Sequence, residues 1–233
     1  MNASDDIATR QVVIFDLFFT LITTDLEDDE YPPTEQVLGI EEPAWCEQVF
    51  NPHHPRFTGA ESDPYRIIES LAHAVNPDIP ESVIREATDQ RIARFERILS
   101  NVPQSTLSVL NELRARGLKT ALISNADCIE TRGWDSSPLA PLFDVTVLSW
   151  QVGFAKPDAR IYRHCLDCLG MSASQGAFIG DGGSDELAGA RAVGLLPIFV
   201  TGMAPDLTRQ AIENRKDSAA HVIHHLEELL HRE

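Results

Sequence analysis

The first residues suited to chemistry are Asp16 and Thr20, which follow an apolar, β-branched run at Val12–Phe15. A continuous apolar run of this kind is typical of a strand buried on both faces of a parallel sheet. Open α/β sheets bind their ligands at the carboxyl ends of such strands, where Asp16 stands. A buried carboxylate without a partner is costly, so we expect a cation, hydrogen-bond donors or a substrate beside it. Such a carboxylate can attack phosphorus or an alkyl halide carbon and form an ester, or it can simply cap the following turn.

Three later stretches carry polar residues near the ends of further predicted strands: Ser124 with Asn125, then Lys156, then Asp181 with Asp185. In a parallel sheet these strand ends meet at one edge, so we expect the side chains to converge on one crevice. A serine there can hydrogen-bond a phosphoryl oxygen, together with backbone N–H groups of the next helix. A lysine there keeps a carboxylate ionised and neutralises a transferred anion. The plainer alternative is that Lys156 and Asp185 are surface residues and Ser124 is a helix cap.

The acidic pair Asp181 and Asp185 predicts a metal site. Beside Asp16 these carboxylates would bring like charges together at a high cost in free energy, unless a cation lies between them. A small cation with oxygen ligands, such as Mg²⁺, removes that cost. We therefore expect Mg²⁺ as the cofactor.

The order of predicted elements indicates an α/β fold with a helical insertion. Residues 22–100 show helical spacing of apolar residues, and no strand pattern interrupts them. From Pro103 onward helices and strands alternate, which predicts a doubly wound parallel sheet with right-handed crossovers. We expect a Rossmann-like core at 1–21 and 101–233, and a small all-helical cap domain at 22–100.

Several local predictions accompany this fold. Residues 1–10 are expected to form a disordered tail, and residues 23–30 a solvated acidic loop. Helices are expected after Asn125, near 206–215, and at the C-terminus after a last strand at 221–223.

Four motifs make the whole chain resemble the haloacid dehalogenase superfamily. In order they are Phe-Asp-Leu-Phe-Phe-Thr-Leu at 15–21, Ile-Ser-Asn at 123–125, Lys-Pro-Asp at 156–158, and Ile-Gly-Asp-Gly-Gly-Ser-Asp-Glu-Leu-Ala-Gly-Ala at 179–190. The helical segment between the first and second motifs is similar to the small cap of the dehalogenase-like and phosphoglycolate-phosphatase-like branches.

The resemblance implies a hydrolase and assigns roles to these residues. Asp16 is the expected nucleophile, and Ser124 and Lys156 are the expected catalytic partners. The resemblance implies that Asp16, Asp181 and the backbone carbonyl of Phe18 hold Mg²⁺. Asp185 is expected to complete the metal site, while Thr20 and Asn125 are expected to bind substrate.

One departure from the family pattern concerns Phe18. Most phosphatases of this family carry a second aspartate there, which serves as general acid and base, and Phe19 replaces the usual glycine. Dehalogenase branches often carry an aromatic residue at the first position but tend to lose the acidic pair, which this chain keeps. We therefore expect a phosphatase with an aspartyl-phosphate intermediate. The alternatives are a metal-free 2-haloacid dehalogenase and a catalytically weak protein that acts as an interaction module.

The cap loop at 51–59 offers a candidate contact with the substrate. His53, His54 and Arg56 could face an anion across the crevice, with Arg56 the most suitable. A solvated loop is the plainer interpretation. The sequence does not specify which small phosphorylated molecule is bound, because cap loops carry specificity without a readable code.

Charge and composition restrict the partners. The 233-residue chain has a formal net charge of −17, which argues against binding nucleic acid or anionic membranes. The first ten residues lack the apolar region of a secretory signal, so a cytoplasmic location is expected. The four cysteines show no metal or disulfide pattern, and we expect them to be free thiols. The oligomeric state is not predicted.

Overall fold

The computed structural model describes residues 3–24, 26, 30–203 and 209–230. Its centre is a six-stranded sheet in the order β3-β2-β1-β4-β5-β6, and every neighbouring pair is parallel. The strands are β1 (Val12–Phe15), β2 (Lys119–Ser124), β3 (Val145–Leu148), β4 (Gly176–Gly180), β5 (Leu196–Val200) and β6 (His221–Ile223). This is the predicted doubly wound α/β architecture.

The strand order places β1 between β2 and β4. Phe15 pairs with Leu122 on one side and with Ile179 on the other. The residues that follow these three strands therefore meet at one edge of the sheet. The direction of strand order reverses next to β1, which is where sheets of this type bind ligands.

Helices cover both faces of the sheet, which explains why β1 is apolar throughout. Val13 and Phe15 belong to the hydrophobic cluster beneath α6 (Gln104–Ala115), and Val12 and Ile14 belong to the cluster beneath α8 and α9. The further core helices are α1 (Ala3–Ile7), α7 (Ser149–Val152), α8 (Ala159–Leu169), α9 (Glu186–Val193) and α10 (Arg209–Lys216). Because side chains alternate along a strand, a strand buried on both faces needs an apolar residue at each position.

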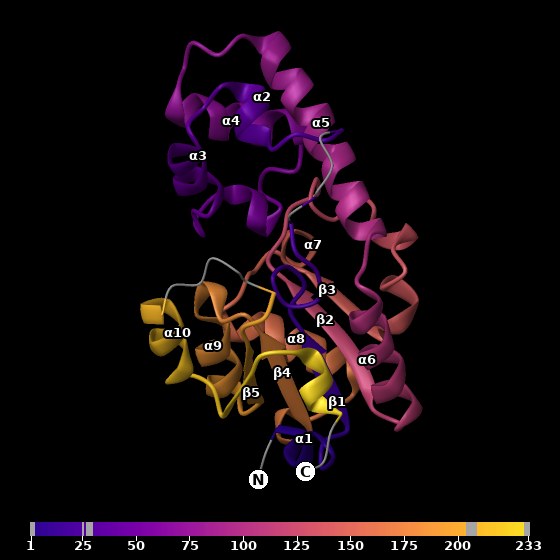
Figure 1. The fold of residues 1–233 in the computed structure, drawn as a ribbon. Coiled ribbons are helices and arrows are strands. Elements are labelled where there is room, and N and C mark those ends of the chain that lie inside the picture. The colour runs from indigo at the N-terminus through magenta and orange to yellow at the C-terminus, as the bar shows by residue number, and fades with distance from the viewer. Residues whose placement is uncertain (1–2, 25, 27–29, 204–208, 231–233) are drawn as a thin grey trace.

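Residues 22–100, the cap segment, contain only helices and loops where the structure describes them. They form α2 (Thr34–Leu38), α3 (Glu42–Val49), the 3₁₀ helix η1 (Pro55–Thr58), α4 (Pro64–Val75) and α5 (Glu81–Ser100). These helices share their own hydrophobic cluster, and Figure 1 shows them beyond one end of the sheet. Helix α5 links the two parts, because Ile84 and Ala87 pack in the cap cluster whereas Ile98 and Leu99 pack in the core.

Several local predictions were wrong. The expected disordered tail contains α1, whose Ile7 is buried against the core. The expected helix after Asn125 is replaced by turns and two short 3₁₀ helices, η2 (Trp134–Ser136) and η3 (Ala140–Leu142). The expected C-terminal helix is one 3₁₀ turn, η6 (Leu226–Leu229). Short segments carry too few residues for a periodic pattern to separate these alternatives.

Other predictions fall partly outside the described residues. Positions 25 and 27–29 of the expected acidic loop lie outside them, as do 204–208 at the start of the helix expected near 206–215. The described part of that helix is α10. The remaining 3₁₀ helices are η4 (Ala173–Gln175) and η5 (Gly183–Asp185).

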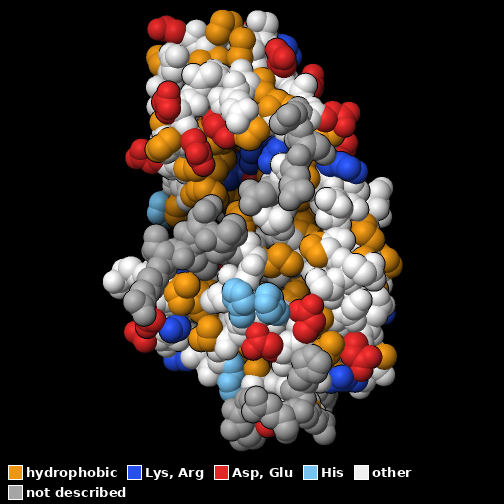
Figure 2. Space-filling model, in the orientation of Figure 1, with side chains coloured by type: hydrophobic (Ala, Val, Ile, Leu, Met, Phe, Trp, Pro, Cys, Tyr) orange, Lys and Arg blue, Asp and Glu red, His pale blue; other side chains and the backbone are white. Residues whose placement is uncertain are grey.

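The surface reflects the acidic composition. On the face in Figure 2, acidic side chains are spread over both the cap segment and the core, with fewer Lys and Arg side chains between them. None of the described helices combines the length and apolar character that crossing a membrane requires.

Candidate active site

Asp16 lies one residue beyond β1, and its backbone N–H donates to Ile179, which extends the pairing with β4. The Asp16 side chain is 9 % exposed. Its Oδ2 accepts a hydrogen bond of 3.0 Å from the Thr20 hydroxyl, and its Oδ1 accepts one from Lys156 Nζ. Thr20 thus contacts the expected nucleophile, and its role in substrate binding stays a prediction.

Lys156 is buried and is held by Asn125. The Asn125 Oδ1 accepts from the Lys156 backbone N–H at 2.7 Å, and its Nδ2 donates to the Lys156 carbonyl at 2.9 Å. This reciprocal pair uses both ends of the amide to join the loop after β2 to the loop before α8. Asn125, expected to bind substrate, therefore positions Lys156 in this structure.

Three carboxylates meet beside Lys156. One oxygen each from Asp16, Asp181 and Glu186 lies within 4.8 Å of the others. Lys156 Nζ also donates to Glu186 Oε2 at 2.6 Å. We call Asp16, Lys156, Asp181 and Glu186 the active-site cluster.

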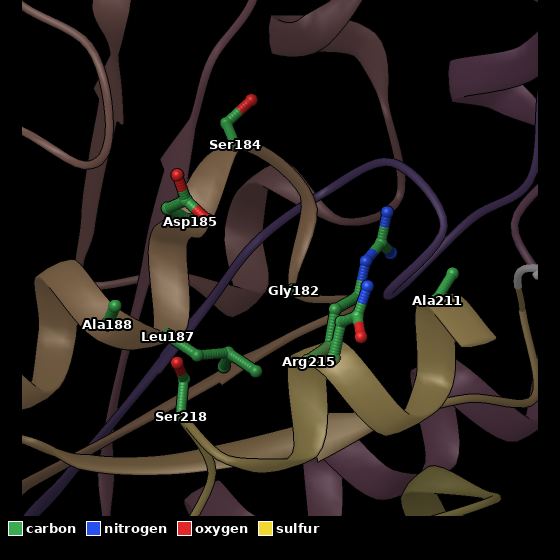
Figure 3. Close-up of a pocket in the computed structure, with 9 residues that line it drawn as sticks. Gly182, Ser184, Asp185, Leu187, Ala188, Ala211, Arg215 and Ser218 are labelled. Carbon is green, nitrogen blue, oxygen red and sulfur yellow. The ribbon is translucent and has the colours of Figure 1, made fainter.

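The expected position of Asp185 in this cluster was wrong, because Glu186 occupies it. Asp185 is exposed, with a φ of 53°, and Ser184 before it has a φ of 52°. These two left-handed residues turn the Asp185 side chain away and bring the first residue of α9 toward the sheet. Figure 3 shows Ser184 and Asp185 together at this turn.

Glycine makes room for the Glu186 carboxylate. A Cβ on Gly180 would lie 2.0 Å from Glu186 Oε1, so a larger residue would exclude it. The Gly182 N–H donates to the same oxygen at 3.0 Å. The Tyr162 hydroxyl holds the Glu186 carbonyl at 2.7 Å. The adjacent acidic residues and Gly180 were the only sequence signals for this site residue.

The electrostatics of the cluster follow from burial and proximity. Burial raises the pKa of Glu186 well above its usual value, and the nearby charges of Asp16 and Asp181 add to this. Burial and Asp16 likewise raise the pKa of Asp181. Burial alone would lower the pKa of Lys156, but attraction to Asp16 and Glu186 outweighs it, so its pKa is raised. The cluster is short of positive charge.

Ser124 ends β2 with a fully buried side chain. Within the described part of the chain, its hydroxyl has no hydrogen-bond partner. Buried polar atoms are normally paired, so this one is suited to an oxygen of a bound group. Together with three clustered carboxylates, it makes the site a good fit for Mg²⁺ and an anionic ligand.

Arg56 does not lie free toward an anionic substrate, in contrast to the prediction. Its side chain is 2 % exposed, and Nη1 donates to Asp127 at 2.5 Å and to Glu130 at 3.0 Å. Its Nη2 donates to the Val49 carbonyl. Arg91 of α5 joins the same group through Glu130 at 2.8 Å. We call Arg56, Arg91, Asp127 and Glu130 the cap–core cluster.

Phe18, two residues after Asp16, is an aromatic residue where most phosphatases of the family carry a carboxylic acid. The ring packs edge-on against Phe95 of α5, with centroids 5.6 Å apart. Phe19, next in the chain, adopts a left-handed φ of 60°. The predicted role of the Phe18 carbonyl as a metal ligand stays a prediction.

Known phosphatases are similar to part of this chain. The chain is 32% identical over 99 residues to a phosphoserine phosphatase of Thermus thermophilus, covering 42% of this chain and 40% of that one. It is 28% identical over 112 residues to a glyceraldehyde 3-phosphate phosphatase of Methanothermobacter thermautotrophicus, covering 47% and 49%. The match thus spans less than half of each relative.

Solved structures and a family profile extend the comparison to the whole fold. A crystal structure of a dehalogenase superposes with a TM-score of 0.69 over 95% of this chain and 96% of that chain, at 16% identity. At this identity the likeness shows the fold alone. The profile of haloacid dehalogenase-like hydrolases matches residues 11–194, which include Asp16, Ser124, Lys156 and Asp181. The chain therefore belongs to the haloacid dehalogenase-like hydrolases.

Proposed function

We propose that the protein is a Mg²⁺-dependent phosphatase that acts on a small phosphorylated metabolite through an aspartyl-phosphate at Asp16. The observation that carries this proposal is the meeting of Asp16, Asp181 and Glu186 within 4.8 Å at the edge of the sheet. Lys156 and Arg215 supply two positive charges against three carboxylates, so an added cation would stabilise the cluster. A cation between carboxylates and a phosphoryl group is typical of phosphoryl transfer.

Asp16 is the nucleophile in this proposal. One carboxylate oxygen attacks phosphorus, the bond from phosphorus to the leaving oxygen breaks, and an acyl phosphate forms on Asp16. Water then attacks that ester, releasing phosphate and restoring the carboxylate. Thr20 and Lys156, which each contact one Asp16 oxygen, keep the carboxylate in a fixed orientation for the attack.

Asp16, Asp181 and Glu186, with the Phe18 carbonyl, are the residues that would hold Mg²⁺. When bound, the ion supplies positive charge that neutralises the carboxylates and the phosphoryl oxygens. Asp185, originally expected at this site, has no part in the proposed coordination. Ser124 donates its unpartnered hydroxyl to a phosphoryl oxygen, and Lys156 adds a second positive charge beside it.

Phe18 sets a limit on the chemistry. Its ring cannot protonate an alkoxide leaving group or deprotonate the attacking water. The proposed enzyme therefore prefers leaving groups that depart without a proton, such as those of aryl and acyl phosphates. The names of the two matched phosphatases support phosphate esters as the substrate class.

The second candidate is a 2-haloacid dehalogenase, and the aromatic residue at position 18 favours it. In that reaction Asp16 displaces halide from carbon and forms an ester without metal. The acidic pair Asp181 and Glu186 argues against this alternative, because two carboxylates beside a third would oppose a metal-free reaction.

The discriminating experiment compares phosphorylated metabolites and 2-haloacids, each with Mg²⁺ and with a chelator. We expect phosphate release that stops in chelator and returns with Mg²⁺, and no labelling of Asp16→Asn by a beryllium fluoride phosphoryl mimic. Haloacid hydrolysis that is undiminished in chelator would support the dehalogenase. Turnover of neither class would contradict both enzyme proposals.

A further inference from the structure

Arg215 of α10 contacts the active-site cluster from a distant part of the chain. Its Nη1 donates to the Asp181 carbonyl at 2.7 Å and to Asp181 Oδ2 at 2.9 Å. The other carboxylate oxygen of Asp181 accepts the Gly183 N–H at 3.0 Å. Both oxygens of Asp181 are therefore fixed, one by its own loop and one by Arg215.

The loop is shaped to let Arg215 approach. Gly182 has a left-handed φ of 78°, and a Cβ there would lie 2.9 Å from the Arg215 Cδ. In Figure 3 the Arg215 side chain extends from α10 on one side of Gly182, while Asp185 lies on the other side. The two side chains line one pocket of about 330 Å³.

The end of α10 is itself held in place. Arg191 of α9 donates to the Asp217 carbonyl at 3.1 Å and to the Ala219 carbonyl at 2.9 Å, just beyond the helix. The Arg215 side chain is 28 % exposed and that of Asp181 is 13 % exposed, so the pair lies at the rim of the buried cluster. Water screens this pair less than it screens a pair at the open surface.

Arg215 changes the net charge of the active-site cluster. Three carboxylates face Lys156 and Arg215, which leaves one excess negative charge. A divalent cation changes this excess to one positive charge, which attracts a phosphoryl anion. Without Arg215, the site with its cation would be neutral. The same arginine repels the cation, because both are positive.

We propose that Arg215 is a positioning residue that fixes the Asp181 carboxylate. Its positive charge lowers the affinity of the site for the divalent cation and raises the affinity for the phosphoryl anion. The proposal rests on the metal site of the proposed function. A unit charge several ångströms away in a partly solvated site changes ligand affinity by on the order of tenfold. Removal of Arg215 should therefore shift the two affinities in opposite directions.

The test measures binding and requires no turnover. Isothermal titration gives the Kd of Mg²⁺, and then that of inorganic phosphate in saturating Mg²⁺, for the wild type and for Arg215→Met. We expect Mg²⁺ to bind about tenfold more tightly and phosphate about tenfold more weakly in the variant. Arg215→Lys, which keeps the charge, should restore both Kd values to within about threefold of the wild type.

Lys216→Met is the matched control, because Lys216 is the next residue of α10 and pairs with Glu213 on the surface. It removes one positive charge and should leave both Kd values unchanged. Thermal unfolding in chelator checks that each variant is folded, and Arg215→Gln replaces Arg215→Met if the latter is not.

The outcomes separate this proposal from the proposed function. If the wild type binds Mg²⁺ and phosphate but removal of Arg215 weakens both, or changes neither, the inference about Arg215 is wrong while the metal site stands. If the wild type binds neither, the proposed function fails, and the role of Arg215 fails with it.

Discussion

The described residues include two largely buried groups of charged side chains, which differ in their balance of charge. The cap–core cluster pairs two arginines with two carboxylates. The active-site cluster sets three carboxylates against one buried lysine, with Arg215 at the rim. A balanced cluster is complete without a ligand, whereas an acidic one is stabilised by a cation. We therefore expect the cap–core cluster to hold the cap segment against the core, and the active-site cluster to perform chemistry.

The hydrogen bonds of the two clusters differ less than their charges do. In the cap–core cluster, Asp127 Oδ1 accepts the N–H groups of Ile129 and Glu130, and Glu130 Oε2 accepts the Asp127 N–H. The carboxylates thus cap their own turn and face the arginines with their other oxygens. Beside the active-site cluster, the Ser124 hydroxyl has no partner among the described residues. Two donors of the cap–core cluster, Arg56 Nε and Arg91 Nε, are also buried without a partner among these residues. Hydrogen bonding alone therefore does not separate the two clusters, and the contrast rests on their balance of charge.

The largest expected effect comes from removing the nucleophile. Asp16→Asn should lower turnover by about 10³-fold or more, since the amide cannot form the ester. Asp127→Asn removes a buried carboxylate of the other cluster and, where that variant is folded, should keep turnover within about tenfold. Steady-state rates on one aryl phosphate check both variants. Comparable losses of turnover in Asp16→Asn and Asp127→Asn would contradict the proposal that only the active-site cluster takes part in catalysis.

The second prediction concerns stability. Glu130→Gln should lower the free energy of unfolding by about 3–5 kcal/mol, because it leaves buried arginine charge without its partner. Glu186→Gln should leave that free energy unchanged or raise it by about 1 kcal/mol, because it relieves repulsion among three carboxylates. Urea unfolding in chelator measures both, with exposed Asp185→Asn expected within about 0.5 kcal/mol of the wild type. If Glu130→Gln and Glu186→Gln lost the same free energy of unfolding, the proposed difference between the two clusters would be wrong.

The cap–core cluster also predicts a pH dependence. Burial alone would raise the pKa of Glu130, but Arg56 and Arg91 outweigh it and hold that pKa below the usual value of 4.5. A carboxyl group with a lowered pKa in the folded state adds stability above its unfolded pKa, and this is lost as the pH falls through the folded pKa. The stability difference between wild type and Glu130→Gln should thus be full at pH 7 and shrink below pH 4.5. A difference that is constant down to pH 3 would contradict the charge explanation.

The fourth prediction concerns Phe18, which follows Asp16 by two residues and packs against Phe95 of α5. A positioned general acid or base contributes about 10²–10⁴-fold in rate. Phe18→Asp should therefore lower the ratio of aryl to alkyl phosphate turnover by about 10-fold to 100-fold. This is less than the full contribution of a general acid, because the new carboxylate replaces a packed ring. Phe18→Leu is the apolar control and should keep the ratio. A wild type that hydrolyses alkyl phosphates as fast as aryl phosphates would show that another group supplies the proton.

The sheet could be predicted from the sequence because each strand is an apolar run ended by a polar residue or a glycine. Three expected positions, Asp16, Ser124 and Asp181, follow from that rule alone, whereas Lys156 lies in the loop after α7 and was expected from its motif. They stand at strand ends or in the loops that follow, and parallel pairing brings these together. The rule requires no knowledge of loop conformation.

The remaining site residues depend on loop geometry and could not be predicted in this way. Asp185 and Glu186 are adjacent carboxylates, and only the left-handed turn decides which one faces the cluster. The ion pairs of Arg56 could not be predicted, because its partners Asp127 and Glu130 lie more than 70 positions away in the chain. Arg215 gave no local signal, since its contact arises only when α10 packs beside the Asp181 loop.

The smallest expected effect is the stabilisation by Mg²⁺. A ligand that binds only the folded state adds about 1.4 kcal/mol to the free energy of unfolding when its free concentration is ten times Kd. Glu130→Gln should gain the same unfolding free energy from Mg²⁺ as the wild type, because Glu130 belongs to the cap–core cluster, which needs no cation. Asp181→Asn should gain much less at the same Mg²⁺ concentration, whereas Asp185→Asn should gain the full amount. Urea unfolding in chelator and in Mg²⁺ gives each increment. Equal gains in all four proteins would mean that Mg²⁺ binds the general acidic surface, which a net charge of −17 makes available, and would contradict a specific site at the edge of the sheet.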